Sequence, residues 1–447
     1  MVNYNEYKNV KMGWLDRIPA HWTTVPLKYS IGKNPFSFVD GDWIESKVIE
    51  SDGIRYLTTG NVGIINYKEQ GNGFISDKTF KELNCTEVFP GDVLISRLNF
   101  PIGRSCIVPN LGYRIVVAVD NVIFRPDETK YNKKYLVYQM NCYPYSENAN
   151  FIARGSTMQR ITRTQLGALK LCVPPLEEQN AMVTYLDKKC SEIDKVISAQ
   201  QKRIALLLEL KQSVITHAVT KGLNPNVEMK DSGVEWIDKI PSNWNIVRLK
   251  NDCSLKGRIG WNGLRSEEFE KESYAYLVTG QDFVSSDIDW SKCYQINKKR
   301  YDEDPCIQLE NGDLLITKDG TIGKIAKVSN MDKPACLNSG IFVLKQKTRK
   351  EFVQGYLYWS LYSDLLKEFN SYTSTGTTIL HLYQNVFENM PLVVPPKKEQ
   401  QEISDYLDKK TKAIDLSLSK AQHQVELLQE YKQSLITEVI TGKRKVC

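Results

Sequence analysis

Residue types that could support catalysis occur in this chain, but their spacing does not match a catalytic arrangement. The fragment Gly320–Lys324 has letters of a phosphate-binding loop, yet Lys318 stands where the first glycine is needed and no Ser or Thr follows the lysine. No Asn/Asp-Pro-Pro-Tyr/Phe tetrapeptide occurs, and the acidic residues of Pro126–Lys130 are too crowded for a metal nuclease. The histidines are dispersed, without metal-ligand spacing or a partner nucleophile: His21, His217, His381 and His423. We therefore predict no catalytic residue, no metal site and no cofactor in this chain.

Polar and basic residues cluster in short segments that follow strand-like runs. Arg, Asn and Gln can pair with guanine or adenine edges, whereas hydroxyls and Lys can take phosphate oxygens. The alternative is that these segments cap strands and that their charges are solvated. We predict DNA contacts at Ser96, Arg97, Asn99 and Arg104, matched in the second half by Thr317, Lys318 and Lys324; at Arg154, Ser156, Thr157, Gln159 and Arg160, matched by Ser374, Thr377, Thr378 and His381; and at Lys256, Arg258 and Asn262 in the second half alone.

The segments match because the chain is an internal repeat. Residues 173–222 and 394–443 align without a gap at an offset of 221, with roughly half of the positions identical. The Trp14–Lys28 segment, with Ile-Pro-x-x-Trp at its centre, returns as Trp236–Lys250. Each half therefore consists of a globular part followed by a long helix.

The two repeated stretches predict coiled-coil helices. Each opens on Pro-Pro followed by Glu-Gln, which suits a helix start, and closes near Gly222 or Gly442, a suitable C-cap. Apolar residues step alternately by three and four, as from Leu186 to Ile197 and from Leu407 to Leu418. Lys211 and Lys432 interrupt the two seams at the same register. One helix of an ordinary bundle is the alternative, but two copies of so long a stripe favour a paired spacer.

Composition places the chain among folded proteins of a reducing compartment. The net charge of +6 permits nucleic-acid binding without requiring it. The ten cysteines are scattered singly, as expected of buried thiols and not of a zinc site or a disulfide framework. No run of eighteen apolar residues and no secretory signal is present, so we predict a cytoplasmic protein.

The predicted fold class is α+β, with two tandem α/β domains separated by two long helices that pair as an antiparallel coiled coil. We divide the chain into a first globular domain (1–172), a first helix (173–222), a second globular domain (223–393) and a second helix with the C-terminus (394–447). Strand-like runs such as Val93–Ile95 and Leu314–Thr317 predict a mixed or antiparallel sheet in each domain. Short helices are predicted over Lys134–Asn141 and, in the second half, Phe352–Phe369.

The connection from Gly222 to Trp236 is short, so the second domain must begin where the first helix ends. That favours antiparallel helices with a pseudo-twofold relation between the halves. Two domains at a fixed spacing suit double-stranded DNA, on which half-sites that share a face lie about 10 bp apart. Subtracting a half-site leaves an unread gap of roughly 6 bp. The cores of the two halves agree, whereas segments such as Asn34–Asp52 and Cys253–Ser273 differ, as expected of domains that read different sequences.

The order of globular part, Val-Pro-Pro-x-x-Glu-Gln helix, second globular part and second such helix resembles the specificity subunit of a type I restriction-modification system. The duplicated Trp-x-x-x-Ile-Pro-x-x-Trp openings carry the same resemblance, which covers essentially the whole chain. The resemblance implies a non-catalytic subunit in which two target recognition domains read the halves of a bipartite, asymmetric DNA site. It also implies that the helices set the spacing and dock two methyltransferase subunits, with restriction subunits in the full complex. S-adenosylmethionine, ATP and Mg are then expected on those partners.

Two alternatives remain at this point. The same module can serve a bipartite system in which one associated polypeptide both methylates and cuts. A coiled-coil scaffold whose globular ends bind proteins belongs to a different class, and it would show no DNA sequence preference.

Overall fold

The computed structural model describes residues 4–155, 158–258, 264–284, 286–347, 351–373 and 382–446. Its backbone divides into two compact units. The first consists of Met1–Gln201 with His423–Cys447, and the second of Lys202–Gln422. Each unit contains one globular domain and a part of each long helix, so the division crosses both helices.

The strands of the first domain form four small sheets. In the largest, β4, β10, β7 and β8 are neighbours in that order and all pairs are antiparallel. The three-stranded sheet has the order β6-β5-β9, and β5 and β9 are parallel. Two antiparallel pairs, β1-β2 and β3-β11, complete the domain. The strands are β1 (Tyr7–Asn9), β2 (Arg17–Pro19), β3 (Thr23–Pro26), β4 (Phe38–Asp40), β5 (Ile54–Leu57), β6 (Phe74–Ile75), β7 (Val93–Ser96), β8 (Ser105–Ile107), β9 (Ile115–Val117), β10 (Asn121–Phe124) and β11 (Lys170–Val173).

Four short α-helices accompany these strands: α1 (Asp77–Glu82), α2 (Lys133–Met140), α3 (Tyr143–Ile152) and α4 (Arg163–Ala168). Side-chain caps start three of them. Ser76 caps α1, Asn132 accepts two backbone N–H groups at the start of α2, and Thr162 with Gln165 forms a capping box on α4.

The second domain repeats this topology. Its four-stranded antiparallel sheet has the order β15-β23-β20-β21, its three-stranded sheet β19-β16-β22 contains one parallel pair, and β12-β13 and β14-β24 correspond to the two pairs of the first domain. The elements are β12 (Met229–Asp231), β13 (Lys239–Pro241), β14 (Asn245–Arg248), α6 (Leu249–Asp252), β15 (Cys253–Gly257), β16 (Ala275–Val278), β17 (Phe283–Val284), β18 (Asp287–Ile288), β19 (Tyr294–Ile296), α7 (Lys298–Asp302), β20 (Leu314–Thr317), β21 (Ile325–Lys327), β22 (Ala335–Leu337), β23 (Ile341–Gln346), α8 (Gln354–Tyr362), α9 (Asp364–Thr373), α10 (Gln384–Phe387) and β24 (Pro391–Val394).

Each four-stranded sheet is buried on both faces. In β7, Val93 and Ile95 belong to a core with the helices, whereas Leu94 between them faces the core of the three-stranded sheet. In β20, Leu314 and Ile316 alternate with Leu315 in the same way. Both domains are therefore layered as helices, antiparallel sheet and mixed sheet, which explains why their strands read as continuous apolar runs.

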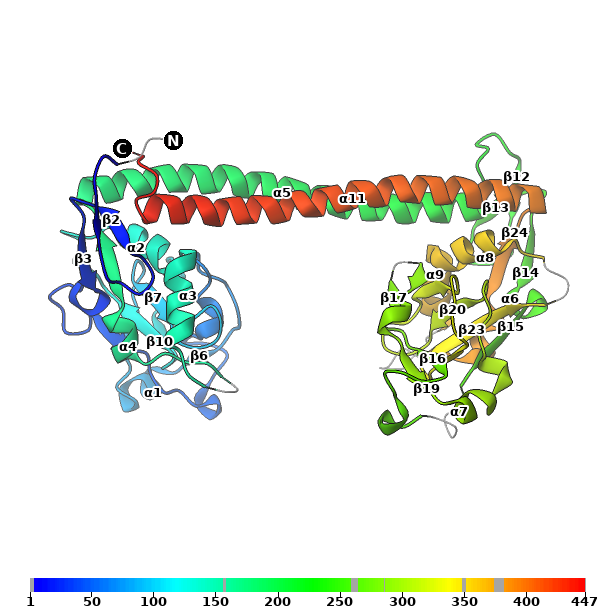
Figure 1. The fold of residues 1–447 in the computed structure, drawn as a ribbon, viewed down its shortest axis with the longest axis horizontal. Helices are drawn as coiled ribbons and strands as arrows, with labels where there is room; N and C mark the ends of the chain where they lie inside the picture. The colour runs from blue at the N-terminus through cyan, green and yellow to red at the C-terminus, as the bar shows by residue number, and fades with distance from the viewer. Residues whose placement is uncertain are drawn as a thin grey trace. The chain divides into compact units, whose positions relative to one another are not determined.

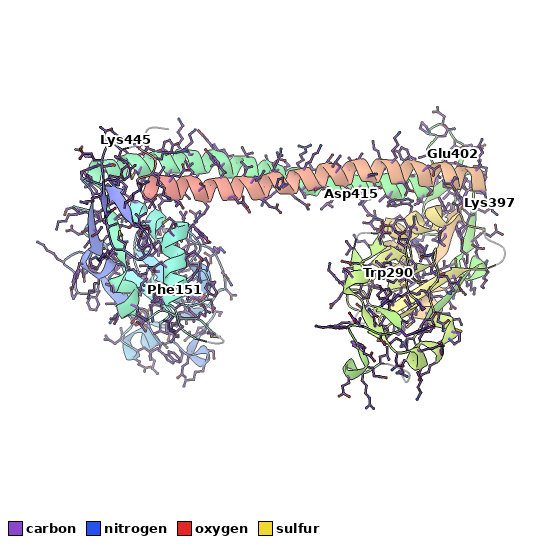
Figure 2. The ribbon with its side chains drawn as sticks, viewed as in Figure 1. Phe151, Trp290, Lys397, Glu402, Asp415 and Lys445 are labelled. Atoms are coloured by element: carbon purple, nitrogen blue, oxygen red, sulfur yellow. The ribbon has the colours of Figure 1, made fainter. Side chains whose placement is uncertain are left out.

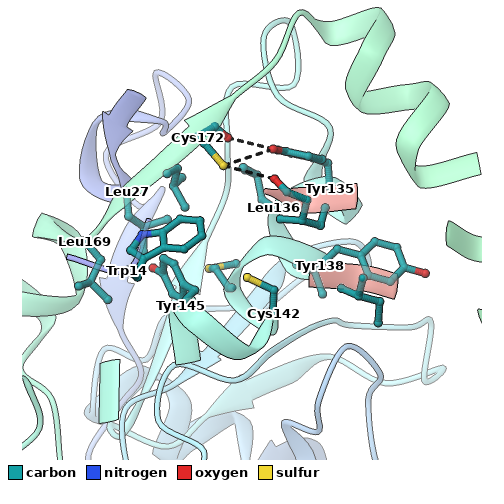
Figure 3. Close-up of a cluster of buried hydrophobic side chains, with 14 of the residues drawn as sticks. Trp14, Leu27, Tyr135, Leu136, Tyr138, Cys142, Tyr145, Leu169 and Cys172 are labelled. Atoms are coloured by element: carbon teal, nitrogen blue, oxygen red, sulfur yellow. Dashed lines mark hydrogen bonds between the residues drawn. The ribbon is translucent and has the colours of Figure 1, made fainter. Parts of the chain in front are cut away.

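The core beside the helices of the first domain contains its buried aromatic residues, several of which Figure 3 shows. The Trp14 ring meets the Tyr145 ring edge-on at 5.5 Å between centroids. The Tyr135 hydroxyl donates to the Cys172 carbonyl at 3.0 Å and so ties α2 to β11.

The predicted helix over Phe352–Phe369 was wrong as a single element. It is two helices, α8 and α9, separated by Ser363, whose backbone is extended with ψ of 171°. The first domain has the same break between α2 and α3. The Ser363 hydroxyl donates to the Ser360 carbonyl at the end of α8, and the chain restarts at Asp364.

The long helices are α5 (Leu176–Lys221) and α11 (Lys397–Ile440) (Figure 1). With 46 residues, α5 is about 69 Å long at a rise of 1.5 Å per residue. Gly222 and Gly442, with φ of 78° and 71°, end the two helices in the left-handed conformation, as predicted.

Both units pair the helices antiparallel. In the first unit, Leu186 and Ile193 of α5 share a core with Leu435 of α11. In the second unit, Ile215 of α5 shares a core with Ile403 of α11. The predicted polar seam positions are ion pairs: Lys432 Nζ lies 2.7 Å from Asp194, and Lys211 Nζ lies 2.7 Å from Asp415. These two pairs occupy equivalent positions in the repeat, so each unit pairs its helix segments in the same register.

Candidate nucleic-acid interface

The repeated sequence motifs bind one another and fix each globular domain to the long helices. The Trp22 indole donates to Glu178 at 3.2 Å, and the Trp244 indole donates to Glu399 at 2.8 Å. Both rings are completely buried. The tryptophan of Ile-Pro-x-x-Trp is thus the partner of the glutamate in Pro-Pro-x-x-Glu-Gln, which accounts for their occurrence together.

The glutamine of Pro-Pro-x-x-Glu-Gln holds the residues just before a short helix, α2 in the first unit and α8 in the second. Gln179 donates from Nε2 to the carbonyls of Lys130 and Pro174, and its Oε1 accepts the Asn132 N–H at 2.9 Å. In the second unit, Gln400 repeats the arrangement with the carbonyls of Glu351 and Pro395 and the Val353 N–H. Both glutamines are fully buried, so these bonds satisfy all polar groups involved.

The same tryptophans receive the C-terminal ends of the helices. A Cβ on Gly442 would lie 3.1 Å from the Trp22 ring, and a Cβ on Gly222 would lie 3.1 Å from the Trp244 ring. In the first unit, the start of α5 and the end of α11 therefore meet at Trp22. In the second unit, the start of α11 and the end of α5 meet at Trp244.

The first predicted DNA-binding segment forms the turn between β7 and β8. Ser96 and Arg97 are buried: Ser96 donates to the Leu98 carbonyl, and the Arg97 guanidinium donates to the carbonyls of Val119 and Ile161. Arg97 Nε also lies 3.0 Å from Asp40. The structure commits both side chains to the fold, and they are not carried into the proposed interface.

Arg104 also has a structural role. Its guanidinium donates to five carbonyls, those of Thr59, Val62, Leu98, Asn99 and Pro101, and burial lowers its pKa. Five backbone acceptors occupy most of the guanidinium donors, so the structure commits Arg104 to the fold. Asn99, with φ of 58°, is exposed at the tip of the turn and stays a predicted DNA contact.

In the second domain, the equivalent turn is held differently. Thr317 is buried, and its hydroxyl donates to the Thr321 carbonyl. Lys318 lies half-buried with its ammonium 5.0 Å from the centre of the Phe342 ring. Lys324 is exposed and stays a predicted phosphate contact.

In the second predicted segment, the described residues 154–155 and 158–160 are hydrogen-bonded to each other and to the first segment. The N–H groups of Arg154 and Arg160 donate to one another's carbonyls, and the Asn99 N–H donates to the Gln159 carbonyl at 3.0 Å. Arg154 and Arg160 are exposed, and Arg160 is paired with Asp120. The structure thus brings the two predicted segments of the first domain together at one edge.

The third predicted segment begins at the end of β15, which contains Lys256. Lys256 is exposed, whereas Arg258 is buried and donates to the Leu337 carbonyl at 3.0 Å. Burial commits Arg258 to the fold, so it leaves the proposed interface. Seven further predicted residues lie outside the described part of the chain: Ser156, Thr157, Asn262, Ser374, Thr377, Thr378 and His381.

Comparison with known proteins identifies the family. The model of the type I restriction modification DNA specificity domain matches residues 41–205 and again residues 241–427. The chain belongs to this family. It is 23% identical to the type I restriction enzyme MjaIX specificity subunit of Methanocaldococcus jannaschii over 99% of the chain and 97% of that protein. It is 25% identical to the MjaVIII specificity subunit of the same organism over 66% of each protein.

The fold is shared with a solved structure of a type I restriction-modification system. A chain from a study of the complex assembly and conformational transition of that system superposes with a TM-score of 0.70 at 15% identity, over 96% of this chain and 99% of that one. The two specificity domains thus correspond to the duplicated halves, and the recurring Trp, Glu and Gln motifs lie where each domain meets the helices.

The segment Pro126–Lys130, whose residues resemble part of a metal-nuclease motif, forms a turn in the first specificity domain. Asp127 accepts from Thr129 and pairs with Lys130 at 3.1 Å, so the segment is a local cap. No three His, Cys, Asp or Glu side chains within the described residues are placed to hold a metal ion. In the same residues, no helix is long and apolar enough to cross a membrane.

Sequence reasoning missed several surface residues around these two hydrogen-bonded segments, the β7–β8 turn and residues 154–155 with 158–160. Phe100, Phe151 and Met158 are exposed apolar side chains, and Arg163 is a half-exposed base that pairs with Asp40. Phe100 and Met158 lie within the predicted segments, but they were not predicted as DNA contacts because only polar and basic side chains were considered.

Proposed function

We propose that this chain is the DNA-reading, non-catalytic subunit of a type I restriction-modification complex. Each specificity domain reads one half of a bipartite, asymmetric site on double-stranded DNA. The observation that carries the proposal is the duplicated family match, combined with two domains that share a core and differ in their surface segments. A shared core preserves the position of the reading edge, whereas different surface segments select different bases.

The long helices set the length of the unread gap in this proposal. Helices α5 and α11 each run without a break, and each domain clamps the start of one and the end of the other through its buried tryptophan. Neither helix can then slide along its partner without breaking a buried contact. The expected gap is roughly 6 bp, from the spacing of half-sites on one face of the duplex.

Two methyltransferase subunits are the proposed partners of the helices. Leu206 and Leu427, at equivalent positions of the repeat, are 55% and 49% exposed, and one turn further Leu210 and Tyr431 are also exposed. Residues four apart lie on the same face of a helix, so the repeat presents the same apolar surface twice. Two equivalent surfaces suit two copies of one partner.

The proposed docking is tested by replacing Leu206 and Leu427 with Ser and measuring assembly with the methyltransferase by analytical ultracentrifugation. Each single substitution should remove one methyltransferase subunit from the complex. The double substitution should remove both. Leu416→Ser is the matched control, because Leu416 is equally exposed but its counterpart is Lys195. Unchanged assembly of the double variant would contradict the docking surfaces.

Restriction subunits join the same complex in this proposal. S-adenosylmethionine, ATP and Mg belong to the partner subunits, which supply the methylation and cleavage chemistry. A module serving a single methylating and cutting polypeptide would bind that polypeptide in place of separate partners. A protein-binding scaffold is not favoured, because the family match covers both domains.

Mapping methylated adenines in a host that expresses this chain with its methyltransferase tests the function. A motif with two specified parts separated by a fixed unspecified gap is expected. It should disappear when this chain alone is deleted. One uninterrupted motif, or methylation unchanged by the deletion, would overturn the proposal.

A further inference from the structure

The first specificity domain exposes apolar side chains to solvent where its β7–β8 turn is hydrogen-bonded to the segment around Gln159. Phe151, directly after Asn150 in α3, is labelled in Figure 2. It is 82% exposed, Met158 is 63% exposed and Phe100 is 59% exposed. Exposed apolar side chains scattered singly are ordinary on a protein surface, but these belong to segments that are hydrogen-bonded together. Such a group marks a contact surface.

The backbone on both sides of Phe100 is anchored by hydrogen bonds. Arg104 donates to the carbonyls on both sides of Phe100, those of Asn99 and Pro101. The Ile102 N–H donates to the Asn150 side chain at 2.8 Å, which joins this turn to the end of α3. A preorganised aromatic side chain loses little conformational entropy on binding, which is how rigid contact residues gain affinity.

The surface includes a groove of about 440 Å³ between this turn, α3 and Gln433 of α11. Phe100, Pro101 and Tyr143 supply its aromatic and apolar lining, and Glu147 and Asn150 lie along the α3 side. The lining leads along α3 from Tyr143 to Asn150, and Phe151 follows.

The described residues of the second domain do not repeat this surface. Residues 318–321, which contain no aromatic residue, replace residues 97–101 of the first domain, and Asp364 stands at the position of Tyr143. Tyr372, the counterpart of Phe151, is less exposed at 55% and packs on Trp236 with 4.6 Å between ring centroids. A surface present in one half only does not suit a partner that binds both halves alike. It does suit the one ligand that must differ between the halves, which is the DNA half-site.

Charge at the same edge fits a DNA ligand. Arg154 is exposed and donates only to the nearby carbonyls of Phe151 and Ala153 among its side-chain hydrogen bonds to described residues. Arg160 and Arg163 lie further along the chain, half-exposed, each paired with one Asp. Basic side chains around an apolar centre can hold the phosphates while the centre reaches the bases.

We propose that the first specificity domain reads part of its half-site through apolar contacts, made by Phe100 and Phe151 with the apolar parts of base pairs. The inference rests on the proposed function. The contacted group is either a thymine methyl or the face of a partly unstacked base step. Arg104 is a positioning residue in this scheme, because it holds the turn that presents Phe100.

The test uses the complex with its methyltransferase and a duplex that carries the mapped bipartite site. Phe100→Ala and Phe151→Ala should each weaken binding roughly tenfold to a hundredfold, the range expected for removing a buried phenyl group. The dependence of binding on salt should stay the same, since no phosphate contact is lost. Replacing the first half-site in the duplex should abolish the difference between variant and wild type, whereas replacing the second half-site should preserve it.

Two modified duplexes distinguish the contacted groups. Deoxyuridine in place of thymine removes only the methyl group, so a methyl contact predicts that this duplex weakens wild-type binding and weakens the responsible variant no further. 2-Aminopurine placed in the first half-site brightens when it is unstacked, so an unstacking contact predicts a signal with wild type that the variant lacks. If neither modified duplex shows its expected effect, the inference is overturned.

Phe89→Ala is the matched control. Phe89 is 52% exposed and precedes β7, whereas Phe100 follows the same strand at its other end. Equal weakening by the control, or wild-type affinity for both variants, would overturn the inference alone. A wild-type complex that does not distinguish the bipartite duplex from scrambled DNA would overturn the proposed function as well. Unchanged thermal unfolding of the variants verifies that they fold.

Discussion

Replacing Gln400 with Ala tests whether the Pro-Pro-x-x-Glu-Gln motif acts within the fold. The side chain is completely buried and makes three hydrogen bonds, two to carbonyls at 2.9 and 3.0 Å and one from the Val353 N–H at 2.7 Å. At about 1 kcal/mol for each bond, the variant should lose about 3 kcal/mol of unfolding free energy. Cavity formation adds to this loss, whereas water entering beside Glu351 subtracts from it.

The second unit contains Lys202–Gln422, and a loss of 3 kcal/mol in a unit of that size lowers Tm by roughly 6–12 °C. Differential scanning calorimetry of the full chain measures the shift. Gln401→Ala is the matched control, because Gln401 is exposed in the same helical turn and bonds only to Asp405 among the described residues. The control should change Tm by less than about 2 °C. Equal stability of Gln400→Ala and wild type would refute the structural role of the motif.

Further predictions address the tryptophans, the coiled coil, the edge of the first domain and the thiols. Trp244→Phe should lower the free energy of unfolding, measured in urea, by about 1.5–3 kcal/mol, because it removes the donor to Glu399. The same loss in a Glu399→Gln background as in the wild type would contradict that pairing. Lys432→Met with Asp194→Asn in a double-mutant cycle should give a coupling of about 0.2–1 kcal/mol that salt weakens, because Asp194 is half-exposed; a coupling that salt leaves unchanged would speak against a solvent-screened pair. Arg154→Gln should weaken binding to every duplex and reduce the salt slope by about one, and an unchanged slope would exclude a phosphate contact. Burial raises the pKa of Cys106 to about 12, so the folded state resists ionisation that the unfolded chain undergoes near pH 9, and stability should fall as the pH rises from about 9 to 12. Cys106→Ala should make that fall shallower in alkaline urea titrations.

The long helices and the internal repeat were predictable because their signals are periodic and occur twice. A three-four spacing over more than forty residues, ended by glycine in both copies, leaves little choice of structure. The short return connection also favoured antiparallel pairing, which the cores of both units confirm. The pairing of Trp22 with Glu178 and of Trp244 with Glu399 could not be predicted, because more than 150 residues separate the partners.

The candidate interface was harder to predict because side-chain chemistry does not specify direction. Arg97, Arg104 and Arg258 have the composition of DNA-binding residues, but distant backbone carbonyls use their guanidinium groups. Phe100 and Phe151 read as core residues in a sequence, since nothing local indicates that the fold turns them outward. Such residues are identified only when the tertiary contacts are known.

The central claim is that the paired helices fix the gap between two half-sites, and a series of duplexes that differ in this gap tests it most directly. Each added base pair moves one half-site by about 3.4 Å and rotates it by about 35° relative to the other. Methylation by the complex should peak at one gap length and fall sharply when a single base pair is added or removed. Equal methylation across the series, with both half-sites intact, would contradict a spacing set by these helices.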